Sequence, residues 1–362
     1  MKRNRIFLIF LIASVFSLLA GCTGAANMAT SWPGFLVDQM TDTVYVSFNA
    51  HVYALNLTNG TEIWRFPREA DNKITFFAEP ALTNDGNLVV GGYNNILYAI
   101  DAANGNKVWE FTGSSNRFVA GALVSENKIF APSSDNYLYT LTEAGNLSWK
   151  AATGHSLWAA PVSDGEFVFQ PSMDHHLYQY NVETGELIWK SDDLGGTMIG
   201  QPLLTPEGQL YVGTFGNEVI AIDTKSHTIL WRFSTNGWVW SGPYLEDGVL
   251  YFGDLEGFVY AVDSQDGKSI WQIQPDIAEN RGIFGRVLVV DESLYFASRS
   301  GILYAVDKAN GNPRWNKTFE AQFLSNLVQS EDTILISANK SDAILFAVDV
   351  NGNQRWSFIP TK

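Results

Sequence analysis

The sequence is short of cysteine, of basic residues and of charge in general. A single Cys among 362 residues excludes an internal disulfide and a thiolate metal cage. Only 23 Lys and Arg stand against 38 Asp and Glu, for a formal net charge of −15. A field of that sign repels phosphate backbones and anionic headgroups, so we expect no nucleic-acid partner and no membrane anchoring through a basic patch.

Recognisable catalytic and metal-binding spacings are also missing. The five His are His51, His155, His175, His176 and His227, and none falls into a zinc-ligand spacing. The adjacent pair, His175 and His176, has side chains that diverge, which indicates an ordinary turn rather than chelation. The chain contains no nucleophile elbow, P-loop or calcium loop. The sequence therefore predicts no catalytic residue, no metal site and no enzymatic activity.

The N-terminus is typical of an export signal. Three basic residues within the first five precede an apolar run that begins at Ile6 and is shorter than the roughly 20 residues of a membrane span. The run ends at Leu19-Ala20-Gly21-Cys22, which resembles the bacterial lipobox. That resemblance implies a signal peptide over 1–21, an acylated Cys22 at the head of a short tether over 22–31, and a folded domain over 32–362.

The lipobox also implies a location. Two or more acyl chains hold a protein stably at a bilayer, so we expect an exported protein whose contact with lipid is the acylated Cys22. Thr23 occupies the position where an Asp would, in many Gram-negative bacteria, retain a lipoprotein at the inner membrane. We expect the periplasmic face of the outer membrane if the cell has one, and otherwise the extracellular face of the cell membrane.

Behind Cys22 the chain consists of eight copies of one pattern, of which LYAIDAANGNKVW is an example. The copies end at Trp64, Trp109, Trp149, Trp189, Trp231, Trp271, Trp315 and Trp356. Successive Trp positions lie 40 to 45 residues apart, a period that fits four short strands with tight turns rather than pairs of helices. Asn-Gly pairs such as Asn104-Gly105 supply the positive φ of a hairpin, and residues such as Asp101 are placed to bond the turn backbone.

We therefore predict an all-β fold, an eight-bladed β-propeller of four-stranded antiparallel blades. In such a ring each blade buries its faces against its two neighbours, and few strand edges remain exposed. The eight repeat tryptophans are expected to be structural residues of the core.

The repeats carry a family resemblance. The pattern LYALDAxTGxxxW is the PQQ-like repeat, and eight copies behind a lipobox resemble the BamB family of outer-membrane β-barrel assembly lipoproteins. This resemblance implies that each repeat Trp docks beside the turn glycine of a neighbouring blade. It also implies a non-catalytic, membrane-anchored scaffold with protein partners in the cell envelope. The alternative is a cell-surface propeller that holds a glycan or peptide.

The repeat takes its name from a quinone cofactor, PQQ, and quinoprotein dehydrogenases are similar in blade pattern. They are much longer, hold the cofactor with large insertions and typically stack a vicinal disulfide on it. This chain has no Cys pair and little sequence between its blades. We therefore expect no PQQ and no other cofactor.

Candidate binding residues precede the first strand of the blades. Four tryptophans outside the repeat position are found there, namely Trp32, Trp158, Trp238 and Trp240, and in a propeller these segments share one face. Three arginines stand near the same face and could receive a carboxylate or acidic peptide, or be solvated or locally paired: Arg117, Arg281 and Arg286. Together the seven residues form a predicted partner-binding mouth.

The same segments show a second regularity. One position is small in seven blades, at Ala78, Ala120, Ala159, Gly200, Ser241, Gly285 and Ser325, as expected where innermost strands crowd together at the ring axis. The next position varies, through Glu79, Gly121, Ala160, Gln201, Gly242, Arg286 and Asn326. Variation between blades is where a repeat scaffold carries its function.

The acyl anchor can be tested by the substitution Cys22→Ser, which removes the thiol that acylation requires. The variant should fold but fail to pellet with membranes, because a chain without acyl groups lacks the hydrocarbon that holds the lipoprotein there. Fractionation into membrane and soluble pools, with circular dichroism as the folding control, measures this. Unchanged membrane partition would contradict the lipoprotein prediction.

Overall fold

The computed structural model describes residues 33–275 and 279–361. The signal peptide over 1–21, Cys22, the tether over 22–31 and Trp32 lie outside the described residues, so these assignments stay predictions. Within the described part, no helix has the length and apolar character needed to cross a membrane.

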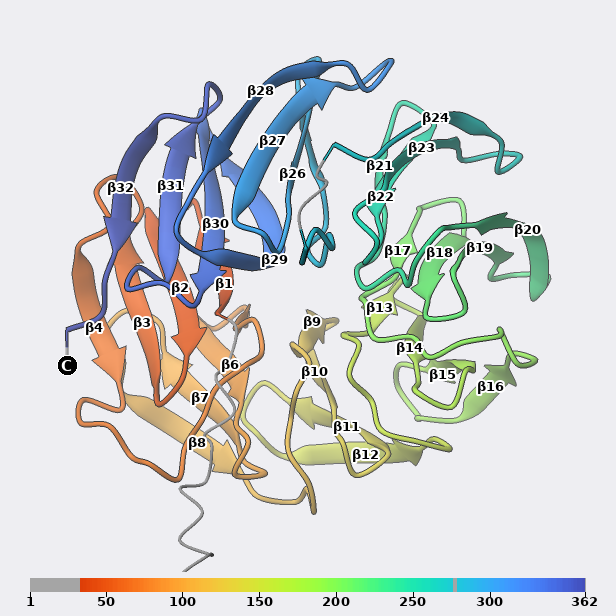
Figure 1. The fold of residues 1–362 in the computed structure, drawn as a ribbon. Coiled ribbons are helices and arrows are strands. Elements are labelled where there is room, and N and C mark those ends of the chain that lie inside the picture. Colours follow the sequence, from red (N-terminus) through yellow and green to blue (C-terminus); the bar gives the residue numbers. More distant parts are fainter. Residues whose placement is uncertain (1–32, 276–278, 362) are drawn as a thin grey trace, which may run out of the picture. The chain divides into compact units, whose positions relative to one another are not determined.

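The chain forms eight four-stranded antiparallel sheets, arranged as blades around a ring (Figure 1), and the predicted eight-bladed β-propeller is confirmed. Blades 1 to 4 comprise β1 (Gly34–Asp38), β2 (Thr43–Phe48), β3 (His51–Asn56), β4 (Glu62–Phe66); β5 (Ala81–Leu82), β6 (Asn87–Gly91), β7 (Leu97–Asp101), β8 (Lys107–Phe111); β9 (Leu123–Ser125), β10 (Lys128–Pro132), β11 (Tyr137–Thr142), β12 (Leu147–Ala152); and β13 (Val162–Ser163), β14 (Phe167–Pro171), β15 (Leu177–Asn181), β16 (Leu187–Lys190). Blades 5 to 8 comprise β17 (Leu203–Leu204), β18 (Gln209–Thr214), β19 (Glu218–Asp223), β20 (Thr228–Ser234); β21 (Tyr244–Glu246), β22 (Val249–Gly253), β23 (Val259–Asp263), β24 (Ser269–Ile273); β25 (Leu288–Val290), β26 (Ser293–Ala297), β27 (Ile302–Asp307), β28 (Pro313–Thr318); and β29 (Gln322–Ser330), β30 (Thr333–Asn339), β31 (Leu345–Asp349), β32 (Gln354–Phe358).

The middle strands of each blade are buried on both faces. In β7, the residues Leu97 to Ile100 are all buried although their side chains point alternately to opposite faces. The reason is that a neighbouring blade covers each face: Tyr45 and Val52 of blade 1 pack with Phe76 and Leu88 of blade 2 in one apolar cluster. The core of the protein therefore lies between blades.

The hairpin joining the third and fourth strands follows the predicted chemistry. In blade 2, an Asp101 side-chain oxygen accepts a hydrogen bond of 2.8 Å from the backbone N–H of Ala103. Gly105 has a φ of +74° and donates its N–H to the Asp101 carbonyl over 2.9 Å. A register shift between Ala99 and Ile100 absorbs the extra residue of the turn.

Seven of the eight repeat tryptophans join their blade to the hairpin of the next. Trp64 of blade 1 lies against Gly105 of blade 2, where a Cβ would come within 2.7 Å of the indole, and its Nε1 donates to the Ala102 carbonyl over 3.0 Å. The same pairing joins Trp109 to Gly145, Trp149 to Gly185, Trp231 to Gly267, Trp271 to Gly311, Trp315 to Gly352 and Trp356 to Gly60. Because the fourth strand is the outermost, most of these indoles are half-buried at the rim, and only Trp231 and Trp356 are buried.

The joint between blades 4 and 5 has a different partner. His227 stands where the other hairpins have glycine, with a φ of +61°, and its ring stacks on Trp189 at a centroid distance of 4.7 Å. His227 Nε2 lies 2.8 Å from the Gln179 side-chain oxygen. Stacking of two flat rings therefore replaces the close approach of indole to glycine backbone.

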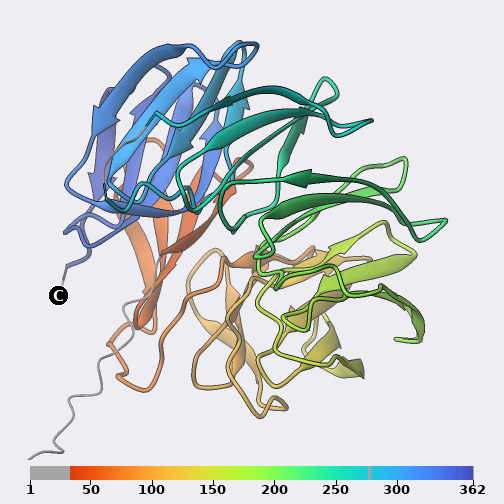
Figure 2. The same ribbon diagram turned by 45° about the vertical axis from the view of Figure 1, so that its right-hand side comes forward.

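The ring closes without exchanging a strand, since every blade consists of four consecutive strands. Trp356 of blade 8 lies against Gly60 of blade 1 and donates to the Leu57 carbonyl over 3.0 Å. Arg65 of blade 1 donates to the Thr361 carbonyl near the C-terminus over 3.0 Å. Figures 1 and 2 both show the last blade, in blue, beside the first, in orange. Non-covalent contacts alone therefore hold this seam.

Two glycines separate the cost of backbone strain from the cost of displacing a tryptophan. Gly86 has a φ of +81° and open space where a Cβ would lie, whereas Gly105 adds the Trp64 contact to a similar φ. Gly86→Ala should cost about 1–2 kcal/mol of unfolding free energy for the left-handed backbone alone. Gly105→Ala should cost a further ~1–3 kcal/mol for overpacking. Urea denaturation measures both, and equal losses would contradict the proposed joint.

Candidate functional site

One end of the ring gathers two kinds of connection, and we call this end the mouth. The loops leading from one blade to the next hydrogen-bond to the turns between second and third strands: Ser134 N–H donates to the Arg117 carbonyl over 3.0 Å, and Leu255 N–H to the Trp238 carbonyl over 2.9 Å. The segments that precede the first strands therefore begin at the mouth and run into the centre of the ring.

Three aspartates fasten these connections. Asp254, fully buried, accepts hydrogen bonds from the Gly237 N–H over 2.9 Å and from the Tyr260 hydroxyl over 2.7 Å. Asp135 accepts equivalent bonds from the Ser115 N–H and the Tyr139 hydroxyl, over 2.9 and 2.7 Å. In blade 4, Asp174 accepts from the Gly154 N–H and the Tyr178 hydroxyl. Each aspartate thus ties an incoming loop to its own blade, which holds the mouth in shape.

The pKa values reflect this bonding. Burial alone would raise the pKa of Asp174, but the hydrogen bonds from Tyr178, from Ser172 and from the His176 backbone outweigh it and lower the pKa. Burial and the bond to Asp174 raise the pKa of Tyr178 to about 12. The carboxylate is therefore held ionised and the phenol protonated at neutral pH.

Aromatic side chains of three blades meet at the mouth. Trp238 is 51% exposed and stacks on Phe215, with ring centroids 4.6 Å apart and planes inclined by 10°. Phe215 also contacts Trp240, at 5.6 Å, and Trp240 contacts Phe284, at 5.0 Å. The Arg299 guanidinium lies 5.7 Å from the Phe284 ring centre. We call Phe215, Trp238, Trp240 and Phe284 the aromatic cluster.

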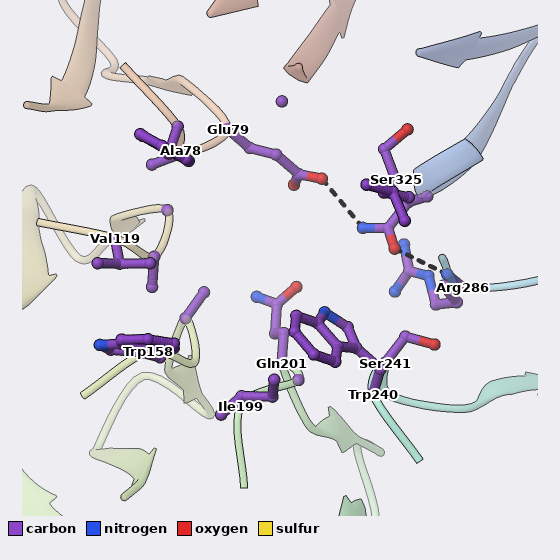
Figure 3. A pocket seen from close by; sticks show the side chains of 18 of the residues that line it. Ala78, Glu79, Val119, Trp158, Ile199, Gln201, Trp240, Ser241, Arg286 and Ser325 are labelled. Atoms are coloured by element: carbon purple, nitrogen blue, oxygen red, sulfur yellow. Dashed lines mark hydrogen bonds between the residues drawn. The ribbon is translucent and has the colours of Figure 1, made fainter. Parts of the chain in front are cut away.

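A cavity of about 200 Å³ lies at the centre of the ring. Residues preceding or opening the first strand of all eight blades line it, including Trp158, Trp240 and Ile199 (Figure 3). The small position predicted from the sequence is found here, with Ala78, Ser241 and Ser325 among the lining residues. The short side chains leave space at the axis that the longer side chains of the next position partly fill.

Charged and amide groups meet in this cavity. The Asn326 amide of blade 8 donates to the Glu79 carboxylate of blade 2 over 3.0 Å, and the Asn326 side-chain oxygen accepts the Arg286 N–H over 2.8 Å (Figure 3). Water reaches Glu79 along the axis, yet protein surrounds its carboxylate. Burial therefore raises the pKa of Glu79, while the nearby Arg286 and the Asn326 bond act to lower it.

The other predicted mouth residues have separate surroundings. Arg281 pairs with Glu256 over 3.0 Å, and Arg117 lies 4.8 Å from the Tyr93 ring centre, so both are engaged locally. Trp158 is half-buried in the cavity wall and donates to the Ser134 hydroxyl over 3.1 Å. Of the three predicted mouth tryptophans in the described part of the chain, Trp238 is the exposed one, and Trp240 connects the aromatic cluster to the cavity.

Sequence reasoning missed Phe215 and Arg299. Both lie in turns between the second and third strands of their blades. Since these turns reach the same mouth, the propeller topology could have identified the two residues as mouth residues. Among the described residues, no group of three or more His, Cys, Asp or Glu side chains is placed to hold a metal ion.

Comparison with known proteins points to one family. The protein-family model described as "Outer membrane protein assembly factor BamB" matches residues 49–163 and 173–356. The crystal structure of BamB from Moraxella catarrhalis superposes with a TM-score of 0.71 at 15% identity, covering 85% of this chain and 96% of that one. This likeness shows the fold.

Curated relatives match over shorter segments. BamB of Nitrosomonas eutropha is 28% identical over 135 residues, which are 36% of this chain and 31% of that protein. A tetrathionate hydrolase of Acidithiobacillus ferrooxidans is 24% identical over 136 residues, which are 31% of this chain and 27% of that protein. The chain thus spans less than a third of the length of either relative.

The hydrogen bonds that Asp174 accepts predict that the unfolding free energy depends on pH. Asp174→Asn should lower the unfolding free energy by about 1–3 kcal/mol at pH 7, because the donors lose a charged acceptor. Since the folded-state pKa of Asp174 lies below its unfolded value, the contribution is complete above about pH 4 and fades as the pH falls through the folded pKa. The difference between wild type and variant should therefore shrink below about pH 4.

Denaturant titrations between pH 2.5 and 7 measure this difference. Glu186→Gln is the control, because within the described residues the exposed Glu186 carboxylate has no hydrogen-bond partner. A difference for Asp174→Asn that stays constant down to pH 2.5 would contradict the assigned role.

Proposed function

Because the chain belongs to the family described as outer membrane protein assembly factor BamB, we propose that it is a non-catalytic scaffold for protein–protein interaction in the cell envelope, acting in outer-membrane protein assembly. The observation that carries the proposal is the family match, which runs through the ring from blade 1 to blade 8. The acylated Cys22 is its anchor, and the periplasmic face of an outer membrane is its place.

The use of the carboxylates at the mouth supports a scaffold. Asp135, Asp174 and Asp254 direct their oxygens at backbone N–H groups and tyrosine hydroxyls that hold loops in place. Groups used in this way stiffen a binding surface. A rigid surface loses little conformational entropy when a partner docks, which favours affinity.

The aromatic cluster is the proposed docking surface. Exposed tryptophan is costly in water and enriched among the residues that dominate interface energies. Trp238 is held flat by Phe215, so its free face is presented without rotamer freedom to lose. The same flat face favours one alternative, a sugar ring stacked on Trp238, which would make the protein a glycan-binding propeller.

Affinity purification of the anchored protein from its own cells, solubilised in detergent, distinguishes these functions. Recovery of a barrel-assembly complex supports the scaffold. Recovery of the protein without an envelope protein partner, together with saturable binding to an immobilised glycan array, would overturn the scaffold in favour of the alternative.

Trp238→Ala provides the residue-level prediction. The variant should lose about 2 kcal/mol or more of partner affinity, as for a central interface aromatic, with a change in stability within about 0.5 kcal/mol because the side chain is exposed. Ile270→Ala is the matched control, since Ile270 is 49% exposed on the outer strand β24, away from the mouth. Co-purification yield and a thermal melt on both variants decide the matter. Equal partner yields from both would exclude the cluster as the docking surface.

A further inference from the structure

We propose that the central cavity is a binding site for a small zwitterion, an amino acid with an apolar side chain, whose carboxylate is held at Arg286 and whose ammonium is held at Glu79. This site is distinct from the exposed face of Trp238 and does not depend on the proposed scaffold function.

The anion side of the site rests on Arg286. This residue lines the cavity on blade 7 (Figure 3), where its backbone N–H donates to the Asn326 side chain. Within the described part of the chain, no hydrogen bond or salt bridge engages its guanidinium. A carboxylate in the cavity accepts two parallel hydrogen bonds from a guanidinium in this position, the bidentate geometry that the two groups favour.

The cation side rests on Glu79. Asn326 holds one of its carboxylate oxygens over 3.0 Å, which orients the group, and no salt bridge to Glu79 is found in the described part of the chain. Glu79 lines the cavity and is accessible to water, and Arg286 is the nearby positive charge that acts on it without a salt bridge. A ligand ammonium would add a direct ion pair to this carboxylate. The Asn326 side chain links Glu79 to the Arg286 backbone, which fixes the two charged groups relative to one another.

The charge count selects the ligand class. The cavity offers one guanidinium and one carboxylate, so a simple anion leaves Glu79 unpaired and a simple cation leaves Arg286 unpaired. Unpaired charge in a partly desolvated site costs free energy. A zwitterion pairs with both.

Size and wall chemistry select the side chain. The cavity of about 200 Å³ exceeds by more than tenfold the roughly 10–15 Å³ that one water needs on the same measure. Trp158, Ile199 and Trp240 supply apolar and aromatic wall. A ligand with an apolar or aromatic side chain covers this wall while its charged end meets the polar groups.

Isothermal titration of the purified full chain in detergent tests the proposal with three matched probes. L-phenylalanine carries both charges, 3-phenylpropionate lacks the ammonium, and L-phenylalaninamide lacks the carboxylate. We expect phenylalanine to bind, and each of the other two to bind at least tenfold more weakly. Absence of phenylalanine binding, or equal binding of phenylpropionate, would overturn the proposal.

Variants assign the two ends. Arg286→Gln should weaken the binding of phenylalanine and phenylpropionate at least tenfold and leave the binding of phenylalaninamide unchanged. Glu79→Gln should weaken the binding of phenylalanine and phenylalaninamide at least tenfold and leave the binding of phenylpropionate unchanged. Arg117→Gln, at the mouth beside Tyr93, is the control and should change none of them. If a thermal melt shows that Arg286→Gln does not fold, Arg286→Lys takes its place; loss of the bidentate donor should weaken phenylalanine binding and leave phenylalaninamide binding unchanged. Phenylalanine affinity that is unaltered in the folded variants would refute the site.

Discussion

Each blade of this ring depends on its neighbours for burial, because its middle strands are apolar on both faces. A single four-stranded sheet of this kind would expose both apolar faces to water, and only a blade on each side removes them. The tryptophan on the outermost strand secures that contact at the rim, where an indole lies on a hairpin glycine and donates to the adjacent carbonyl, as Trp64 does at Gly105 and Ala102. The burial between blades supplies the free energy, and the indole sets the register in which neighbouring blades meet.

The fold could be predicted from sequence because its determinants recur. The Trp recurs in every blade and the turn glycine in seven of the eight, with a period of 40 to 45 residues, and the small position at the axis recurs for a steric reason of the same kind. The exception at blade 5 is visible as His227 four residues before Trp231. That Trp189 lies against this turn is implied by the docking of the other repeat tryptophans, but the stacking of the His227 ring on it was not predictable, because it occurs at one joint and leaves no periodic signature.

The site was only partly predictable, because its contacts belong to the assembled ring. Glu79 and Asn326 are 247 residues apart in the sequence and meet beside the axis, with blade 1 between their own blades, a pairing that no repeat pattern encodes. The sequence placed Trp158, Trp238 and Trp240 at one mouth, but their exposure differs: Trp238 is open, while the other two are half-buried and line the cavity. Phe215 stacks on Trp238 from a turn between the second and third strands of blade 5, a contact that the repeat pattern does not encode.

The hydrogen bond between Asn326 and Glu79 helps to keep the ring closed at the seam between blades 8 and 1. The chain itself links each of the other seven pairs of adjacent blades through a loop. Blades 8 and 1 are held together by non-covalent side-chain and backbone contacts. The bond runs from blade 8 to blade 2 and so bridges the seam on the inner side of the ring. Any separation of blade 8 from blade 1 must stretch it and widen the cavity. A ligand that binds in the cavity of the closed ring therefore stabilises the closed ring against separation of blades 8 and 1. Conversely, a variant that weakens this seam should lower the affinity of the cavity for the ligand.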